Sequence, residues 1–218
     1  MERVLEPELM DDEQQSIAYA KADFSTSDRW YVDHLMMDFP EHLLEVIDIG
    51  CGPAGVIIRL ARAKPDIHIT GVDGSGPMIK LARQAVQVAG LEKQISPTQG
   101  YVPGLPLEEH SYDAVISKDF LHHLPDPSAL WHEVKRLGKP GAAVYVMDLF
   151  RPQTPDDALR IVEEVSANED PILKRDFYNS LCAAFSVEEI QEQLKRAGLD
   201  LQVAPISERQ LVIKGLLH

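Results

Sequence analysis

The chain has 218 residues, of which 44% are hydrophobic and 26% are charged, so it is long and apolar enough for one sizeable folded domain. Its 21 Lys and Arg residues against 35 Asp and Glu residues give a net charge of −14. Phosphate backbones and anionic lipids repel such a chain, so we expect no nucleic-acid partner and no membrane association.

The number of cysteines and the composition of the first residues bear on the cellular compartment in which the protein is expected. Two cysteines are too few for a disulfide framework or a structural zinc site, so we expect no metal. The start of the chain, MERVLEPELMDDEQQ, is acidic and shows no secretion-signal pattern. We therefore expect a cytoplasmic protein with reduced thiols.

The first 149 residues predict two helices and then an alternation of strands and helices. The helices are expected around 11–23 and 27–38, the second ending before Pro40. After them we expect strands at 46–49, 67–72, 95–99, 112–117 and 142–148, and helices at 56–64, 77–89 and 128–137, with a turn at 139–141. This order predicts a parallel sheet with right-handed crossovers.

The rest of the chain departs from this alternation. Residues 150–185 are polar and helical in pattern and longer than an ordinary loop. A capping box at Ser186 opens a helix that closes at Gly198. Runs at 201–206 and 211–214 are too close for a helical crossover, so they predict an antiparallel hairpin. We expect an α/β three-layer sandwich with a mostly parallel seven-stranded sheet that ends in this hairpin.

A glycine-rich turn follows the first strand. Gly50, Gly52 and Gly55 form a G-x-G-x-x-G pattern between a strand and a helix, where the backbone can turn tightly and a nucleotide can approach. Asp73 ends the second strand, where a carboxylate can bind both hydroxyls of a ribose. These residues predict a nucleotide-binding site.

With these motifs the chain resembles the class I S-adenosylmethionine-dependent methyltransferases of the small-molecule type. The matching segments are VIDIGCGPAG (46–55), GVDGS (71–75), SYDAVIS (111–117), LHHLPDP (121–127) and KRLGKPG (135–141). The resemblance implies an enzyme that moves the sulfonium methyl group of S-adenosylmethionine to a small-molecule acceptor.

The resemblance also implies which residues contact the cofactor. Asp48 and the glycine loop would meet its amino-acid part, Asp73 the ribose, and Gly74, Ser75 and Met78 the adenine. The full expected set is Tyr19, Asp48, Gly50, Cys51, Gly52, Gly55, Asp73, Gly74, Ser75, Met78, Gly100, Tyr101, Val102, Ser117 and Lys118. Gly100-Tyr101 departs from the family's usual Gly-Asp, and the Tyr101 phenol can accept a hydrogen bond there instead.

Two histidines are candidate catalytic residues. His122 and His123 follow the fourth strand, and an imidazole can take the proton that a methyl acceptor loses. Packing at the start of a helix is the alternative role. Methyl transfer also gains from alignment of donor and acceptor without any base.

Four residues are candidate contacts of the acceptor. Asp148 ends the fifth strand at the edge where open α/β sheets bind ligands. Arg151 could bind a carboxylate or phosphate, or pair with an acid such as Asp156. Tyr178 and Asn179 lie in the helical insertion. We expect residues 1–40 and the insertion 150–185 to form a lid over the methyltransferase domain of residues 41–218.

Two other functions stay open. A non-catalytic protein that binds the cofactor and acts through a partner would have nearly the same sequence, and Tyr101 supports it. A nicotinamide-dependent oxidoreductase shares the glycine pattern, but no Tyr has a Lys four residues later. The oligomeric state, the accepting atom and the acceptor are not visible in the sequence.

Overall fold

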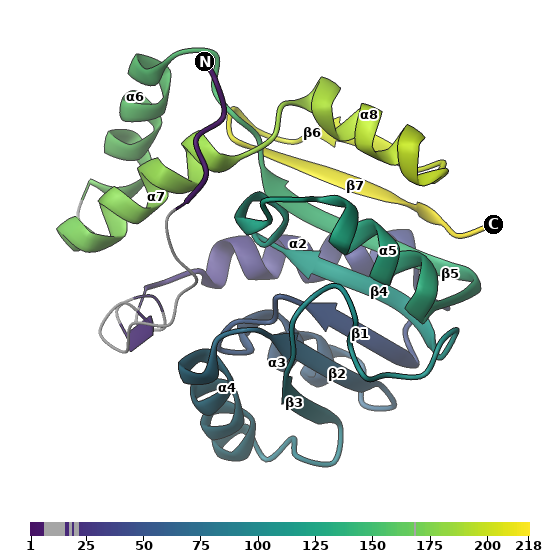
Figure 1. Cartoon of the computed structure of the whole chain (residues 1–218). Coiled ribbons are helices and arrows are strands. Elements are labelled where there is room, and N and C mark those ends of the chain that lie inside the picture. Colours follow the sequence, from purple (N-terminus) through teal and green to yellow (C-terminus); the bar gives the residue numbers. More distant parts are fainter. Residues whose placement is uncertain (7–15, 18, 20–21, 168) are drawn as a thin grey trace.

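The computed structural model describes all residues except 7–15, 18, 20–21 and 168, and helices cover both faces of its central sheet (Figure 1). The strands are β1 (Glu45–Ile49), β2 (His68–Asp73), β3 (Ile95–Gln99), β4 (Tyr112–Lys118), β5 (Gly138–Leu149), β6 (Gln202–Pro205) and β7 (Gln210–Leu216). The helices are α2 (Ser25–Asp38), α3 (Gly55–Ala63), α4 (Gly76–Ala89), the 3₁₀ turn η1 (Leu121–His123), α5 (Ser128–Leu137), α6 (Pro155–Ser166), α7 (Pro171–Ala183) and α8 (Val187–Ala197).

The seven strands lie in the order β3-β2-β1-β4-β5-β7-β6. Strands β1 to β5 pair in parallel, whereas β7 runs antiparallel to both β5 and β6. The predicted three-layer sandwich with its terminal hairpin is therefore confirmed. The strand order reverses between β1 and β4, which is where open α/β sheets bind their ligands.

Alternate residues of the central strands fill two separate cores. On β5, Tyr145 and Met147 pack with α2, α3 and α4, whereas Val144 and Val146 pack with α5 and α8. Helix α2 is part of the first layer, because its Tyr31 is fully buried and donates a hydrogen bond to the Tyr145 carbonyl at 2.8 Å. Of the region expected to form an N-terminal lid, the described residues 25–38 therefore pack on the sheet.

Three further segments expected from the sequence are compared with the structure: the turn at 139–141, the stretch 150–185 and the first helix. The turn expected at 139–141 lies inside β5, where the pairing with β4 shifts register between Tyr112 and Ala114. The polar stretch 150–185 contains α6 and α7, which share a small core beside Leu149. The helix expected around 11–23 falls mostly outside the described residues. Within the described part of the chain, no helix is long and apolar enough to cross a bilayer.

Candidate active site

The glycine loop after β1 is fixed on two sides. The backbone N–H groups of Gly50 and Cys51 both donate to the Val72 carbonyl of β2, at 2.8 and 2.9 Å. Gly50 has φ +82°, and a Cβ there would lie 2.4 Å from Cγ of Phe120 in the loop after β4. Position 50 therefore requires glycine both for its backbone conformation and for this contact.

Asp73 ties the glycine loop to the end of β2. Its Oδ2 accepts a hydrogen bond from the Gly52 N–H at 2.9 Å, and its Oδ1 accepts one from the Ser75 N–H at 2.8 Å. Each carboxylate oxygen can accept more than one hydrogen bond, so Asp73 keeps capacity for ligand hydroxyls. A Cβ on Gly52 would meet nothing within 4 Å, so the loop leaves open space at this position.

Asp48 is a buried acid with an unused oxygen. It lies at the end of β1 with 2% of its surface exposed, and its Oδ1 has no hydrogen-bond partner in the described part of the chain. Burial, and next the charge of Asp73, raise the pKa of Asp48 to about 8. A buried carboxylate of this kind needs a donor, and a ligand ammonium group would supply one.

A cavity of about 570 Å³ opens beside this carboxylate. It is bordered by the glycine loop, by Asp48 and Lys118 at the ends of β1 and β4, and by part of α4. Of the expected cofactor residues, Tyr19, Asp48, Gly50, Cys51, Gly52, Gly55 and Lys118 line it. The structure thus brings together residues that are far apart in the sequence.

The expected adenine-binding residues form a neighbouring group. Tyr101 packs on Gly74, where a Cβ would lie 3.0 Å from its ring. Ser75 is the N-cap of α4 and accepts a hydrogen bond from the Met78 N–H at 3.2 Å. Ser117 is buried and is not among the described residues that line these cavities; its hydroxyl donates to the Ile49 carbonyl at 2.6 Å and joins β4 to β1.

Two consecutive charged residues at the end of β4 line different cavities: Lys118 lines this one and Asp119 lines a second one. Lys118 Nζ lies 2.6 Å from Asp119 Oδ2 and 3.3 Å from Asp28 Oδ1. Burial disfavours the ammonium, but Asp119, Tyr19 and Asp28 outweigh burial and raise the pKa of Lys118. Asp119 has φ +53°, and its Oδ1 is buried and unpartnered in the described structure.

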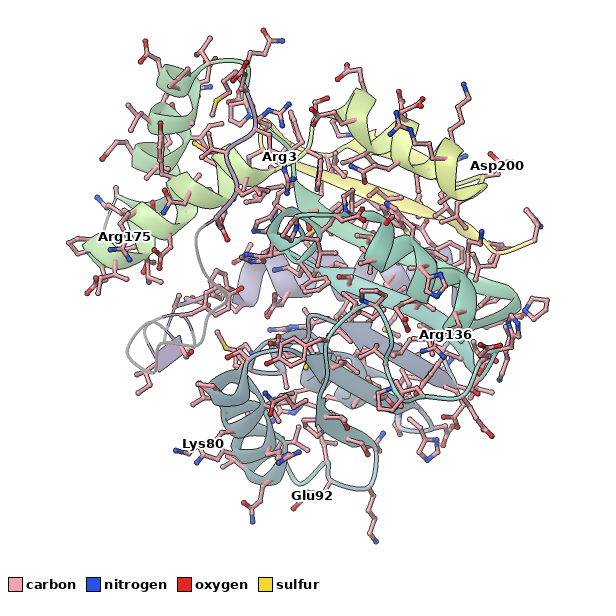
Figure 2. All side chains as sticks on the ribbon, viewed as in Figure 1. Arg3, Lys80, Glu92, Arg136, Arg175 and Asp200 are labelled. Atoms are coloured by element: carbon pink, nitrogen blue, oxygen red, sulfur yellow. The ribbon has the colours of Figure 1, made fainter. Side chains whose placement is uncertain are left out.

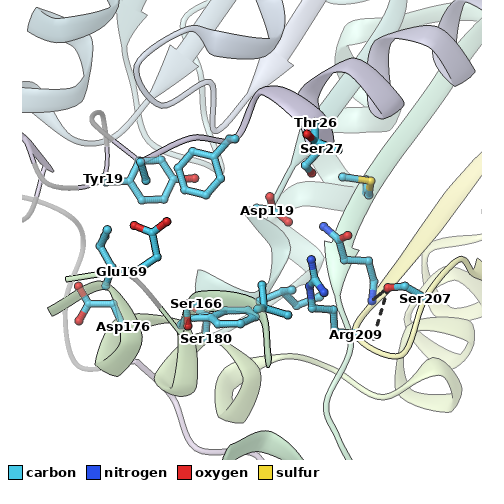
Figure 3. Close-up of a pocket in the computed structure, with 18 of the residues that line it drawn as sticks. Tyr19, Thr26, Ser27, Asp119, Ser166, Glu169, Asp176, Ser180, Ser207 and Arg209 are labelled. Carbon is cyan, nitrogen blue, oxygen red and sulfur yellow. Dashed lines mark hydrogen bonds between the residues drawn. The ribbon is translucent and has the colours of Figure 1, made fainter. Parts of the chain in front are cut away.

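The second cavity, of about 490 Å³, lies beyond Asp119, between the start of α2, helices α6 and α7, and the β6–β7 turn (Figure 3). Its walls include the apolar residues Trp30, Met147, Leu149, Leu173, Phe177 and Ile206. Its charged groups are Asp23, Asp119, Glu169, Asp176 and Arg209, of which the last lies in the β6–β7 turn. The cavity walls are therefore largely apolar, and most of the charged groups among them are acidic.

Both candidate histidines line the second cavity, and each has its own carboxylate. His122 Nδ1 lies 2.6 Å from Asp148 Oδ1, and both side chains are almost fully buried. His123 Nδ1 contacts Glu6, which also accepts a hydrogen bond from the Ser180 hydroxyl at 2.5 Å. Potential metal-ligating atoms of Glu6 and the two histidines lie within 4.8 Å of one another. However, both Nδ1 atoms are already used by carboxylates.

The N-terminal segment 1–6 reaches this loop by crossing α7 (Figures 1 and 2). The Val4 N–H donates to the Cys182 carbonyl at 3.0 Å. Arg3 donates to the carbonyls of His122 and Leu124 at 3.0 and 2.9 Å, and its guanidinium lies 3.7 Å above the Phe185 ring. This segment therefore fixes the two-histidine loop from outside.

The comparisons with known proteins agree with this geometry. Residues 47–146 match the family model described as "Methyltransferase domain". That segment contains β1 to β4 and most of β5, together with the glycine loop, Asp73 and the two-histidine loop. Residues 47–146 are therefore a methyltransferase domain.

Two curated relatives and one solved structure are also named as methyltransferases. Methyltransferase GfsG of Streptomyces halstedii is 28% identical over 76% of this chain and 56% of its own length. The 27-O-demethylrifamycin SV methyltransferase of Amycolatopsis mediterranei is 27% identical over 73% and 55%. The chain thus spans just over half the length of these curated relatives. A putative S-adenosyl-L-methionine-dependent methyltransferase from Methanococcus maripaludis has the same fold, with TM-score 0.77, 21% identity and 99% and 98% coverage.

All four residues expected to contact the acceptor lie after residue 146, and three of them make contacts within the protein itself. Asp148 accepts hydrogen bonds from Phe120, Leu121 and Leu149 N–H groups as well as pairing with His122. Arg151 donates hydrogen bonds to the Met1 and Ala184 carbonyls and, at 2.8 Å, to Glu189, so the acid that pairs with it is Glu189 in place of the expected Asp156. Tyr178 packs with the core shared by α6 and α7. Among the described residues that line the two cavities, none of these three appears, and neither does Asn179.

The residues that do line the second cavity include several that sequence reasoning missed. On α7 they are Leu173, Asp176, Phe177 and Ser180, whose spacing of three, four and seven residues places them on one helix face. Phe177 and Ser180 lie next to the predicted Tyr178 and Asn179 on the same helix, but on the face that borders the cavity. Arg209 was missed because only the pairing of β7 with β5 brings the turn beside Leu149.

Proposed function

We propose that this protein is an enzyme that transfers the methyl group of S-adenosylmethionine to a small-molecule acceptor held in the second cavity. One observation supports this above all: the two cavities adjoin. They share Tyr19, Ala22, Asp23 and Phe24, and Lys118 of one cavity is followed directly by Asp119 of the other. Adjacent cavities allow a donor and an acceptor to be aligned, which is the main requirement of methyl transfer.

The residues present fit the methyl donor. The unpartnered oxygen of Asp48 would accept a hydrogen bond from its ammonium group, and the open space at Gly52 would admit its amino-acid part. Asp73 would bind the ribose hydroxyls, and Tyr101 on Gly74 would border the adenine. When bound, S-adenosylmethionine supplies an electrophilic methyl group on a sulfonium.

The size and lining of the second cavity favour a small-molecule acceptor. Its volume of about 490 Å³ lies within the usual range for small-ligand sites, and most of its walls are apolar. The rifamycin methyltransferase among the relatives also bears the name of a small-molecule acceptor. The net charge of −14 disfavours nucleic acid. Because both cysteines are free and buried, we also propose that the enzyme works in the cytoplasm.

Calorimetric titration with S-adenosylmethionine, S-adenosylhomocysteine and NAD⁺ tests the donor site. We expect micromolar binding of the two adenosyl ligands and none of NAD⁺. Asp73→Asn should weaken that binding about 10- to 100-fold, since hydrogen bonds to a charged carboxylate are lost. Asp66→Asn, at the exposed turn before β2, should bind as the wild type does.

Turnover is then measured as S-adenosylhomocysteine formed with a panel of small alcohols, phenols, amines and thioethers. Acceptor-dependent formation of this product supports the enzyme. Tight adenosyl-ligand binding without turnover on any acceptor would favour the non-catalytic alternative, and NAD⁺ binding alone would contradict the proposal.

A further inference from the structure

Resting on the proposed methyl transfer, we propose that the acceptor carries a carboxylate and that Arg209 binds this carboxylate in the second cavity. The carboxylate is the group by which the acceptor is recognised, and a different atom of the same molecule receives the methyl group. The substrate class is therefore an apolar molecule with one anionic end.

The first argument is the fixed position of Arg209 in the β6–β7 turn. The Ser207 hydroxyl accepts hydrogen bonds from the N–H groups of Arg209 and Gln210, at 3.3 and 3.0 Å. The Arg209 carbonyl accepts one from the Phe150 N–H at 3.0 Å, which ties the turn to the end of β5. Because Leu149 at that end lines the second cavity, the turn is held directly beside it.

Arg209 borders the cavity, whereas the acid before it is exposed to solvent. Ser207, Arg209 and Gln210 all line the cavity. Glu208 is not among the lining residues, its side chain is 74% exposed, and it accepts a hydrogen bond from Arg160 of α6 at 3.1 Å. The acid that is nearest in sequence is therefore paired with another arginine and does not neutralise Arg209.

The second argument is that Arg209 brings a positive charge without a counter-ion. Its side chain is half-buried, and within the described part of the chain its guanidinium makes no hydrogen bond and no ion pair. By contrast, two acids of the same cavity have cations of their own: Asp119 has Lys118 at 2.6 Å, and Asp176 has Arg175 at 3.0 Å. A half-buried guanidinium gains from a ligand that supplies the missing negative charge and hydrogen-bond acceptors.

The other acids of the cavity lie away from Arg209 or in solvent. Glu169 and Asp176 lie on one side of the cavity, and Arg209 and Ser207 lie on the other (Figure 3). Asp23 and Glu169 are exposed, so water and salt screen their charges. Their repulsion of an anion bound at the guanidinium is therefore weak.

The charge and the shape of this site favour a carboxylate over a phosphate. A planar guanidinium binds a carboxylate through two parallel N–H···O hydrogen bonds. A phosphate monoester carries a charge of about −1.5 to −2 at pH 7. Among the described residues that line the cavity, Arg209 is the only Arg or Lys. One negative charge on an apolar body therefore matches the single guanidinium and the largely apolar walls.

Arg209 also orients the acceptor toward the methyl donor. Tyr19 and Phe24 belong to the wall that the two cavities share. Tyr19 lies across the second cavity from Arg209 (Figure 3). An acceptor bound at Arg209 extends its other end toward the shared wall, so the atom that is methylated lies at the end opposite the carboxylate.

Ligand titrations followed by ¹H–¹⁵N NMR test this site on protein saturated with S-adenosylhomocysteine. The probes are 3-phenylpropanoate, 3-phenylpropanamide and 3-phenylpropylamine, which share one apolar body and end in an anion, a neutral amide and a cation. We expect the acid to bind at least about 10-fold more tightly than the amide or the amine. We also expect it to shift the Nε–H signal of Arg209.

Three variants separate the charge from the shape of the side chain. Arg209→Gln should weaken binding of 3-phenylpropanoate about 10- to 100-fold and leave binding of 3-phenylpropanamide unchanged. Arg209→Lys should recover part of this loss, because it restores the charge without the planar fork. Arg62→Gln removes the same charge from the exposed end of α3 and should bind all three probes as the wild type does.

Three results would overturn the carboxylate site while S-adenosylhomocysteine is bound. They are amide or amine binding as tight as that of the acid, acid binding that Arg209→Gln leaves unchanged, and no detectable binding of the acid at millimolar concentration. Failure of the wild type to bind S-adenosylhomocysteine would instead contradict the proposed function.

Discussion

Asp48 lines the proposed donor site as a buried acid with one oxygen unpartnered among the described residues. Its pKa of about 8 in the folded protein exceeds its ordinary value of 3.8. Between these two values the unfolded chain releases the proton and the folded chain keeps it. Rising pH therefore reduces the free energy of unfolding across this window and not beyond it.

Asp48→Asn should remove that penalty. We expect the variant to gain about 1–3 kcal/mol over the wild type at pH 8 and little at pH 4, less than the whole pKa difference implies because the amide is also underbonded. Thermal unfolding across this pH range measures the gain, with Asp66→Asn as control. A gain that is equal at all pH values would contradict the assigned pKa.

The same pKa predicts proton release on ligand binding. A cationic ligand beside Asp48 favours the ionised carboxylate and lowers its pKa. Binding of S-adenosylmethionine at pH 7 should therefore release a fraction of one proton to the solvent. Calorimetry in buffers of different ionisation enthalpy measures this number, and Asp48→Asn should abolish it.

Alanine variants of Gly50 and Gly141 can be compared directly, because both glycines have φ +82°. A Cβ on Gly50 would overlap Phe120, whereas one on Gly141 meets nothing within 4 Å. We expect Gly141→Ala to cost about 1–2 kcal/mol from backbone strain alone. Gly50→Ala should cost at least about 2 kcal/mol more and weaken donor binding. Equal losses in denaturant unfolding would show that the contact with Phe120 is unimportant.

At the scale of elements, the N-terminal segment has a testable role. Arg3 donates hydrogen bonds to the carbonyls of Ala183, His122 and Leu124. Arg3→Ala should lower the free energy of unfolding by about 1–3 kcal/mol and speed amide exchange in residues 121–124. Arg196→Ala, whose side chain is 78% exposed, should change stability by no more than about 0.5 kcal/mol. Unchanged exchange in Arg3→Ala would contradict the contact.

The elements also show what the sequence could and could not predict. Strand β3, helix α5 and the caps at Gly90 and Ser186 were predictable because local chemistry determines them. The inward face of α7 was not predictable, since it depends on how α6 packs against it. Arg209 lines the second cavity and Glu6 contacts His123 in its wall, both through long-range packing that no local pattern signals. The roles of the donor-site residues stay a prediction.

At the scale of the molecule, the two cavities share one wall. Phe24 lines both cavities, whereas Phe177 lines only the second. Phe24→Ala should raise both the Kd of S-adenosylhomocysteine and the KM of the acceptor, each about 5- to 30-fold from lost apolar contact. Phe177→Ala should raise the acceptor KM alone. Calorimetry and steady-state kinetics separate the two effects, and equal behaviour of the variants would contradict the shared wall.

The division of the chain at Leu149 has a consequence for how the proposed enzyme can diversify. The donor site is built largely from residues before that point, whereas α6, α7 and the β6–β7 turn come after it. Under the proposed function, mutations downstream of residue 149 should change which molecule is methylated while donor binding stays intact. A combinatorial library at Leu173, Phe177 and Arg209, which line the second cavity, should therefore select for new acceptors.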